Sequence, residues 1–418
     1  MSLVQNLVNL SVKNWSFSLD WLPPPACLVG GAVRDALLNR QGEYLDLDFV
    51  LPAEAVETAR RIANHYHAGF VVLDEQRQIA RVVFERGTVD FAQQEGDSLE
   101  TDLGRRDFTV NAIAYNPRSC KLIDPLQGLI DLEQGVLRMV SKANLEDDPL
   151  RLLRAYRQAA QLNFTIDPTT RATIHTLAPL LSKVAAERVQ TELGYLLANP
   201  QGSRWLAAAW EDGLLRVWFE NAKAENMQQV VRVDESAKLI GKIWPKLIET
   251  HTDNLRTKPV VMAKLASLVS SVPAEAELEL VRLKYSRAEI RTVTAAVKHL
   301  PRLLKEGTVP MTLTQQYFFF LDVGDIFPIL AVLAVALGSN TEAIAPLIHR
   351  YLDPKDRVSH PKPLVTGNDL MQALQIPPSP KIGKLLTEIQ LACIEGKIST
   401  SEDALQFAAS LVEELNDT

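Results

Sequence analysis

Two acidic residues near the N-terminus, Asp46 and Asp48, have a spacing that can support chemistry. Alternate residues of a β-strand share a face, so their carboxylates would project together, about 6.7 Å apart along the strand. Leu45, Leu47 and Phe49 would then face the core. Two carboxylates on one face can hold divalent metal ions such as Mg²⁺. Such ions activate an attacking hydroxyl and neutralise a leaving pyrophosphate, as phosphoryl transfer requires.

A glycine-rich turn precedes the acidic pair, in the sequence Leu-Val-Gly-Gly-Ala-Val-Arg-Asp at residues 28–35. Gly30 and Gly31 let backbone amides approach a triphosphate closely, and Arg34 at the start of the next helix adds a charged donor. Alone, a Gly-Gly pair is usually a turn, and an Asp-x-Asp strand is usually a solvated face. In this order and spacing, the two features together predict a nucleotidyl-transfer site.

Two further motifs carry charge into the same part of the chain. Asp90 lies between two apolar residues on a predicted strand and can add a third carboxylate, although the signal is weak on its own. Arg105 and Arg106 precede the sequence Asp-Phe-Thr-Val-Asn-Ala at residues 107–112. Adjacent arginines before a buried segment are costly unless an anion or an acidic partner receives them. The alternative for this pair is plain surface charge.

A second acidic and basic motif spans residues 147–157. Asp148 precedes a proline and can be simply a helix cap. Asp148 and Arg151 are also three residues apart, so on a helix they can present one acceptor and several donors to the edge of a single base. Arg154 and Arg157 drift by about 60° per three-residue step, which suits phosphate contacts better than base reading. Residues 187–193 can buttress this helix through an ion pair or form a solvated face.

Composition excludes several classes of protein. The 418 residues are 47% hydrophobic and 23% charged, which is ordinary for a globular protein of two to four domains. The three cysteines are too few and scattered for a disulfide framework or a zinc site. The formal charge of −7 argues against indiscriminate nucleic-acid binding but leaves room for a local basic groove. The first ten residues have no basic region, and no later stretch approaches eighteen uncharged apolar residues, so we expect no membrane insertion and a cytoplasmic location.

Periodicity divides the chain into a mixed α/β part and an all-α part, which is an α+β fold. The mixed part is predicted to contain two helices, 33–38 and 52–66, and four strands, 45–51, 70–73, 81–84 and 88–92. Helical periodicity takes over beyond Asn144, with breaks at 199–202, 301–310 and 354–363. Lysine and arginine are enriched between Ser236 and Glu306, either on solvated helix faces or along a phosphate-backbone track.

Taken in order, these motifs resemble those of the class II tRNA nucleotidyltransferases, the CCA-adding enzymes and their poly(A) polymerase relatives. The resemblance is dense over Leu28–Leu193 and looser beyond, where residues 366–370 and 381–386 also resemble the family's tail. It implies a nucleotidyltransferase head with a small mixed sheet, followed by a helical neck with nucleotide-template helices, an RNA-binding body and a tRNA-binding tail. The corresponding ranges are 1–138, 139–200, 201–310 and 311–418.

The resemblance also implies roles for individual residues. Mg²⁺ would bind Asp46 and Asp48, and a tRNA acceptor stem would lie along the all-α part. Asp148 and Arg151 would form a protein template that pairs with the incoming base of CTP or ATP. The remaining implied nucleotide contacts are to the triphosphate from Gly31, Arg34 and Arg106, and at the nucleotide site from Arg154 and Arg157.

One departure from the family pattern bears on the product. Members that add complete CCA carry a flexible segment of some two dozen residues between the third strand carboxylate and the double arginine, and here only Ala92–Asp97 separates that strand from Ser98. The resemblance therefore favours a CC-adding enzyme that leaves the adenosine to a separate A-adding enzyme. None of the seven histidines has the ligand spacing of a His-Asp phosphohydrolase, so a second catalytic domain is not expected.

The same motifs are also compatible with other functions. The chain can be a complete CCA-adding enzyme that uses CTP and ATP, or a poly(A) polymerase that uses ATP alone. A different class, a catalytically inactive RNA-binding protein on the same fold, is opposed by the intact motif residues. These are Asp46, Asp48, Arg34, Arg106 and Arg151.

Overall fold

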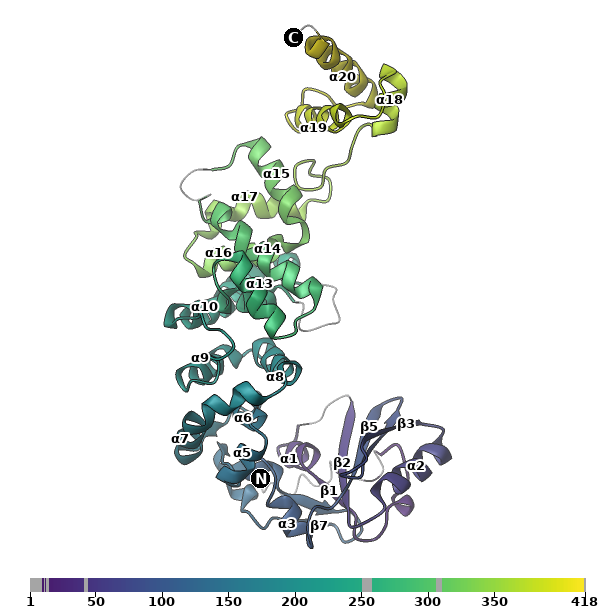
Figure 1. Ribbon diagram of the computed structural model, residues 1–418, viewed down its shortest axis with the longest axis vertical. Coiled ribbons are helices and arrows are strands. Elements are labelled where there is room, and N and C mark those ends of the chain that lie inside the picture. Colours follow the sequence, from purple (N-terminus) through teal and green to yellow (C-terminus); the bar gives the residue numbers. More distant parts are fainter. Residues whose placement is uncertain are drawn as a thin grey trace. The chain divides into compact units, whose positions relative to one another are not determined.

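The computed structural model describes residues 10, 12, 15–40, 44–249, 258–305 and 310–416 (Figure 1). The chain divides into two compact units, Met1–Trp218 and Phe219–Thr418. The first contains the mixed sheet and five helices that follow it, and the second is helical throughout its described residues. The predicted α+β fold class is confirmed. The finer division into head, neck, body and tail stays a prediction.

Seven strands of the first unit form one mixed sheet with the order β3-β4-β5-β2-β1-β6-β7. Within it β2 and β5 run parallel, while the other neighbouring pairs are antiparallel. The four predicted strands correspond to β2 to β5. The three strands that the sequence did not predict are three residues long, too short to show an alternating pattern. The strands are β1 (Cys27–Val29), β2 (Leu45–Leu51), β3 (Gly69–Asp74), β4 (Ile79–Phe84), β5 (Gly87–Gln93), β6 (Ala114–Asn116) and β7 (Lys121–Ile123).

The apolar face of the central strands is a packed aromatic core. Phe49 of β2 stacks on Phe91 of β5 with ring centroids 5.7 Å apart, and Phe17 packs against both rings at 5.9 and 6.1 Å. Offset and edge contacts at these distances stabilise aromatic clusters beyond simple burial. Because side chains alternate along a strand, this packing directs the even-numbered residues of both strands to the opposite face.

Short helices connect the strands. The predicted helix at 33–38 is α1, and the one at 52–66 is α2, which begins at Ala55 because Glu54 adopts a left-handed φ of 56° just before it. The other regular elements of this part include a 3₁₀ turn, η4, with bounds Thr109–Asn111. The helices are α1 (Gly31–Leu37), α2 (Ala55–Tyr66), α3 (Leu99–Leu103) and α4 (Gly128–Gln134).

Five helices complete the first unit, and α6 packs against both α8 and α9. The expectation of helices alone beyond Asn144 is wrong at one point, since β9 (Thr165–Ile166) pairs in parallel with β8 (Val136–Leu137). This two-residue strand is too short to interrupt a helical pattern visibly. The helices are α5 (Lys142–Asp147), α6 (Leu150–Leu162), α7 (Pro168–Leu177), α8 (Ala186–Ala198) and α9 (Gly202–Glu211).

A buried hydroxyl ties three of these helices together. Tyr156 on α6 is fully buried, and its hydroxyl donates to Asp212, which also accepts from Nε of Arg171 at 2.7 Å. In Tyr156→Phe, Asp212 keeps the arginine as a partner, so we expect a loss of about 1 kcal/mol in the free energy of unfolding. Chemical denaturation of the variant measures this loss. An unchanged midpoint would show that the hydroxyl contributes nothing.

The second unit is built around α16, which packs against α10, α12 and α14. The last three helices share an apolar cluster of their own, which includes Leu370, Leu385, Ile389 and Ala404. The helices are α10 (Ala224–Ile243), α11 (Pro245–Ile248), α12 (Pro259–Leu268), α13 (Pro273–Arg282), α14 (Arg287–Leu304), α15 (Leu313–Val323), α16 (Phe327–Ala336), α17 (Thr341–Leu352), α18 (Gly367–Leu374), α19 (Pro380–Ile394) and α20 (Ser401–Asn416).

One apolar run in this unit is interrupted by Asp322 and Asp325, so it does not contradict the expectation that no eighteen-residue uncharged apolar stretch is present. Leu313–Ala336 is long and apolar enough, by composition, to cross a membrane, and 61% of its most apolar window is buried inside the protein. The run consists of α15 and α16 joined by a 3₁₀ turn that contains Asp325, rather than one continuous helix. Core packing of α16 accounts for its hydropathy.

The basic segment between Ser236 and Glu306 also needs a correction. Lys264 is 2% exposed and pairs with Asp234 at 2.7 Å, so it belongs neither to a solvated face nor to a phosphate track. Burial lowers the pKa of Lys264 and outweighs the opposing effect of the aspartate. Arg256, another member of the segment, lies outside the described residues.

Candidate active site

The acidic residues of β2 and β5 lie on the sheet face opposite the aromatic core. Asp48 is in register with Asp90 on the neighbouring parallel strand, and Asp46 is in register with Thr88. The Thr88 hydroxyl donates to Asp46 at 2.6 Å. Both oxygens of Asp90 accept hydrogen bonds from Arg81 of β4, at 2.6 and 2.8 Å. The three carboxylates therefore share a face, but the Asp90 carboxylate already has a cationic partner.

Negative charge is crowded around Asp48. Burial and the charges of Asp90 and Asp46 raise its pKa to about 6, against the opposing effects of Arg106 and Arg81. A cation at this face would relieve that repulsion, and hard carboxylate oxygens are the ligands that Mg²⁺ prefers. The residues present therefore fit a divalent metal ion held by Asp46 and Asp48. Over the described ranges, no three His, Cys, Asp or Glu side chains converge as a ready-made metal cluster.

The glycine turn meets the carboxylates directly. Gly30 lies between β1 and α1 with φ of 74°, a conformation that strains other residues. A Cβ atom at this position would lie 3.1 Å from Nη1 of Arg106 and 3.3 Å from Oδ2 of Asp48. Gly31 opens α1, and Arg34 on the same helix donates to Asp35 and Asn111. The turn, the acidic strand and the double-arginine motif thus converge on one point.

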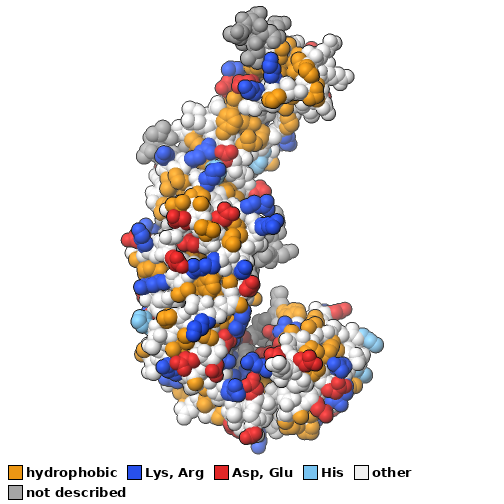
Figure 2. All heavy atoms as spheres, viewed as in Figure 1, with side chains coloured by type: hydrophobic (Ala, Val, Ile, Leu, Met, Phe, Trp, Pro, Cys, Tyr) orange, Lys and Arg blue, Asp and Glu red, His pale blue; other side chains and the backbone are white. Residues whose placement is uncertain are grey.

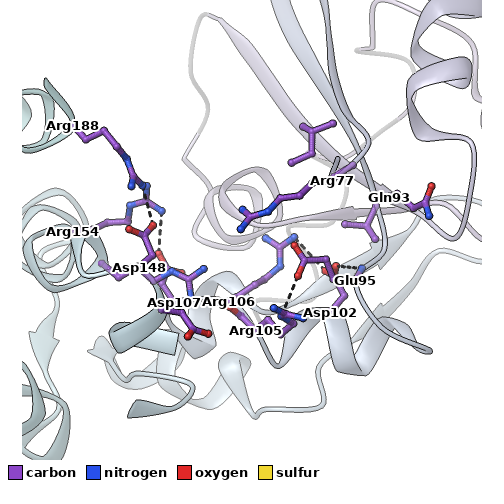
Figure 3. Close-up of a pocket in the computed structure, with 15 residues that line it drawn as sticks. Arg77, Gln93, Glu95, Asp102, Arg105, Arg106, Asp107, Asp148, Arg154 and Arg188 are labelled. Carbon is purple, nitrogen blue, oxygen red and sulfur yellow. Dashed lines mark hydrogen bonds and ion pairs between the residues drawn. The ribbon is translucent and has the colours of Figure 1, made fainter. Parts of the chain in front are cut away.

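A pocket of about 590 Å³ adjoins this point, because Arg106 also lines it (Figure 3). Its wall combines the ends of β2 and β5 with charged side chains from the segments around α3, α5, α6 and α8. On the surface of the first unit, both basic and acidic side chains border a hollow (Figure 2). The lining residues are Val50, Arg77, Ile79, Ala92, Gln93, Glu95, Asp102, Arg105, Arg106, Asp107, Asp147, Asp148, Arg151, Arg154 and Arg188.

Asp148 lies at the junction between α5 and α6, where Pro149 rather than Asp148 is the N-cap of α6. One carboxylate oxygen accepts from the Leu150 amide at 3.3 Å, so it supports the helix start only partly. The other accepts from Arg188 of α8 at 2.9 Å, which confirms the predicted alternative of a buttressing ion pair. Arg151 donates to the carbonyls of Arg105 and Asn144 at 2.8 and 3.1 Å.

The other two arginines of α6 differ in their surroundings. Arg154 lines the pocket and lies 3.5 Å from both Asp107 and Glu192. Arg157 is not among the lining residues, and its Nε donates to Glu192 at 2.5 Å. Glu192 is nearly buried on α8, so it holds Arg157 against the neighbouring helix.

Comparison with known proteins assigns the family. The family described as Poly A polymerase head domain matches residues 26–138. The family described as Probable RNA and SrmB-binding site of polymerase A matches residues 163–225. The family described as tRNA nucleotidyltransferase domain 2, putative, matches residues 254–409. A CC-adding tRNA nucleotidyltransferase of Synechocystis sp. is 55% identical, over 94% of this chain and 95% of its own. The chain belongs to the tRNA nucleotidyltransferase family. The predicted enzyme class is confirmed.

Two further relatives show the breadth of this family. An A-adding tRNA nucleotidyltransferase of Deinococcus radiodurans is 31% identical, over 94% of this chain and 96% of its own. A solved structure described as a CCA-adding enzyme with CTP superposes with a TM-score of 0.72 at 24% identity, covering 93% of this chain and 91% of that one. The last likeness supports the fold.

Several residues at the site have no role that the sequence motifs predict. Arg77 reaches the pocket from the turn between β3 and β4, and Glu95 and Asp102 pair there with Arg105 and Arg106 at 3.1 and 3.7 Å. The sequence does not predict that Arg77 lies at the site. Its position depends on the strand order, because β4 pairs with β5 and brings the β3–β4 turn next to the pocket. Asp107 belongs to a motif that sequence alone did identify.

Proposed function

We propose that this protein adds two cytidines to the 3′ end of tRNA, using CTP and releasing pyrophosphate. The supporting observation is the connection between β5 and α3. It consists of residues 94–98, of which Ser98 is already the N-cap of α3. A connection this short has little slack for rearranging the base pocket between one nucleotide and the next.

Local bonds tie this connection down at both ends. The Gln94 amide donates to the Leu51 carbonyl at 2.7 Å, and the Glu95 amide donates to Asp102 at 3.0 Å. Gly96 has φ of 84° and lies so close to Thr101 that an added Cβ atom would be 2.6 Å from its methyl group. Because Glu95 also pairs with Arg105, the connection is anchored to the rim of the pocket.

The proposed roles follow from the geometry. Mg²⁺ held by Asp46 and Asp48 would supply Lewis-acid activation of the tRNA 3′ hydroxyl and charge neutralisation of the pyrophosphate. The Gly30–Gly31 backbone, Arg34 and Arg106 would bind the triphosphate. We retain Asp90 as a third carboxylate, with Arg81 holding it in place. For Arg157, predicted as a nucleotide contact, we propose instead that it supports Arg154 through their shared partner Glu192.

The base is read by groups that match cytosine. A carboxylate accepts from the cytosine amino group, and a guanidinium donates to its ring nitrogen and carbonyl oxygen. Asp148 and Arg151 line the same pocket and supply these groups. Arg188 holds the Asp148 carboxylate, and the carbonyls that bind Arg151 fix its direction.

Asp148→Ala is expected to relax selectivity for CTP more than it slows the reaction. A site built on hydrogen bonds discriminates through the polar groups that a wrong base leaves unpaired. Loss of one such contact should reduce the preference for CTP over UTP about tenfold or more. Values of kcat/KM for the four nucleoside triphosphates measure this change. Unchanged selectivity with lower stability would leave Asp148 as a junction between helices and nothing more.

The proposed partner set follows from this activity. The acceptor stem of tRNA would contact the helical second unit, and a separate A-adding enzyme would complete the CCA end. We infer a cytoplasmic location because tRNA and nucleoside triphosphates meet there. The 55% identity to a CC-adding enzyme favours tRNA extension over poly(A) synthesis and over an inactive RNA-binding role.

Incorporation of labelled CTP and ATP, tested separately, decides between the products. The substrates are a tRNA ending at the discriminator base and the same tRNA extended by one and by two cytidines. We expect CTP to extend the first by two residues and the second by one, with ATP giving little product on any. Efficient addition of one adenosine to the third substrate would show complete CCA addition, and a long adenosine tract would show a poly(A) polymerase.

A further inference from the structure

Asn111 lies at the centre of a buried polar network in the first unit. It is 7% exposed and closes the 3₁₀ turn η4. Its Oδ1 accepts from Nη1 of Arg34 at 2.6 Å, and its Nδ2 donates to Asp107 at 2.8 Å and to Gln158 at 3.0 Å. One carboxamide thus joins α1, the double-arginine motif and α6.

The two ends of this carboxamide meet opposite charges. Its oxygen faces the Arg34 guanidinium, whose remaining nitrogens Nε and Nη2 donate to Asp35 at 2.9 and 3.0 Å. Its nitrogen faces Asp107, a 6% exposed carboxylate. An aspartate at position 111 would repel Asp107. An apolar residue there would remove one hydrogen-bond partner from Arg34 and one from Asp107. An amide satisfies both.

Asp107 connects Asn111 to an arginine of the base pocket. Burial alone would raise its pKa, but Arg154, Asn111 and the Phe108 amide together lower it, so the charged form is favoured. Asp107 lines the pocket and lies 3.5 Å from Nη1 of Arg154. A short chain of polar contacts therefore runs from Arg34 on the triphosphate side, through Asn111 and Asp107, to Arg154 on the base side.

We propose that Asn111 is a positioning residue that sets the separation between the triphosphate and base contacts of one bound CTP. It orients Arg34 directly and Arg154 through Asp107. This inference rests on the proposed function, in which both arginines contact the nucleotide. Its signature is a loss of CTP affinity with little change in the chemical step.

Steady-state kinetics of Asn111→Ala with CTP and a tRNA acceptor test the inference. We expect KM for CTP to rise about tenfold, as for the loss of a hydrogen bond to a charged group, while kcat changes about twofold or less. The KM for tRNA should stay unchanged. Asn111→Ser, which keeps a polar group but cannot reach both ions, provides a second variant and should give the same KM pattern. A fall in kcat alone, in both variants, would overturn the inference.

A double-mutant cycle with Arg34→Ala separates positioning from general stability. If Asn111 acts partly through Arg34, the combined rise in KM should fall short of the product of the single effects by about threefold or more. Multiplicative effects would overturn the inference and leave the Arg34 assignment standing. A normal KM in Arg34→Ala alone would instead refute the nucleotide role of Arg34. Tyr156→Phe is the matched control, because it weakens a buried polar contact of α6 away from the pocket and should leave KM unchanged.

Discussion

Replacing Asp46 or Asp48 with alanine is expected to abolish nucleotidyl transfer while the protein stays folded and still binds tRNA. The two carboxylates lie on the face of β2 opposite the aromatic core, and removing either one relieves repulsion between like charges, so we expect the fold to be kept. Losing a metal ligand should remove several kcal/mol of transition-state stabilisation, hence about a thousandfold or more in rate. Single-turnover incorporation of CTP measures this loss, and circular dichroism with tRNA binding checks the fold.

Two further variants make the assignment specific. Glu57→Ala removes an exposed carboxylate from α2 in the same unit and should keep normal activity. Asp90→Asn tests the third carboxylate, whose two oxygens are engaged by Arg81, and should cost less than either β2 variant. Turnover within about tenfold of normal in Asp46→Ala or Asp48→Ala would reject the metal assignment. Equal losses of rate in all three aspartate variants would indicate that Asp90 is a metal ligand like Asp46 and Asp48.

The sequence predicted the part of the site that is built from local pattern. The alternation around Asp46 and Asp48 predicted their shared face because strand geometry fixes which side chains lie together. The glycine pair likewise predicted a turn, and Gly30 does adopt a conformation that favours glycine. Both features depend on a few neighbouring residues, which is why spacing alone was sufficient.

Contacts between distant segments were harder to predict. The ion pair between Asp148 and Arg188 was one of two open alternatives, since 40 residues separate the partners and helix packing decides whether they meet. Arg157 illustrates the converse: its motif predicts a nucleotide contact, but packing of α6 on α8 brings it against Glu192. Buried Lys264 fits neither predicted alternative for the basic segment, because composition does not reveal an acidic partner on a neighbouring helix.

Short strands and apolar helices carry little information about their packing in the sequence. Strands of three residues carry too little alternation to be recognised, so the β1–β6–β7 half of the sheet was absent from the prediction. Leu313–Ala336 is a case in which packing, rather than composition, decides the role of an apolar run. Composition alone leaves this run long and apolar enough for a membrane span, and the three-dimensional packing shows instead that α16 packs against α10, α12 and α14.

Grafting a flexible segment into the connection between Ala92 and Ser98 is expected to permit adenosine addition, which the proposed CC-adding activity excludes in the unmodified chain. Base switching needs the pocket beside Asp148 to rearrange, and the bonds from Gln94 and Glu95 to Leu51 and Asp102 hold the present connection in one conformation. A graft of about two dozen residues would remove that restraint at an entropic cost of only a few kcal/mol.

The readout is addition of one adenosine to a tRNA that already ends in two cytidines, with ATP at millimolar concentration. The unmodified protein should stall on this substrate, and the grafted protein should extend part of it while keeping cytidine addition. A graft of equal length between Ser119 and Cys120, in the exposed turn of the β6–β7 hairpin and outside the pocket lining, is the control for insertion alone, and it should not confer adenosine addition. Efficient adenosine addition by the unmodified protein would refute the CC-specific assignment. A graft that preserves cytidine addition but gives no adenosine would show that base choice is restricted elsewhere in the pocket.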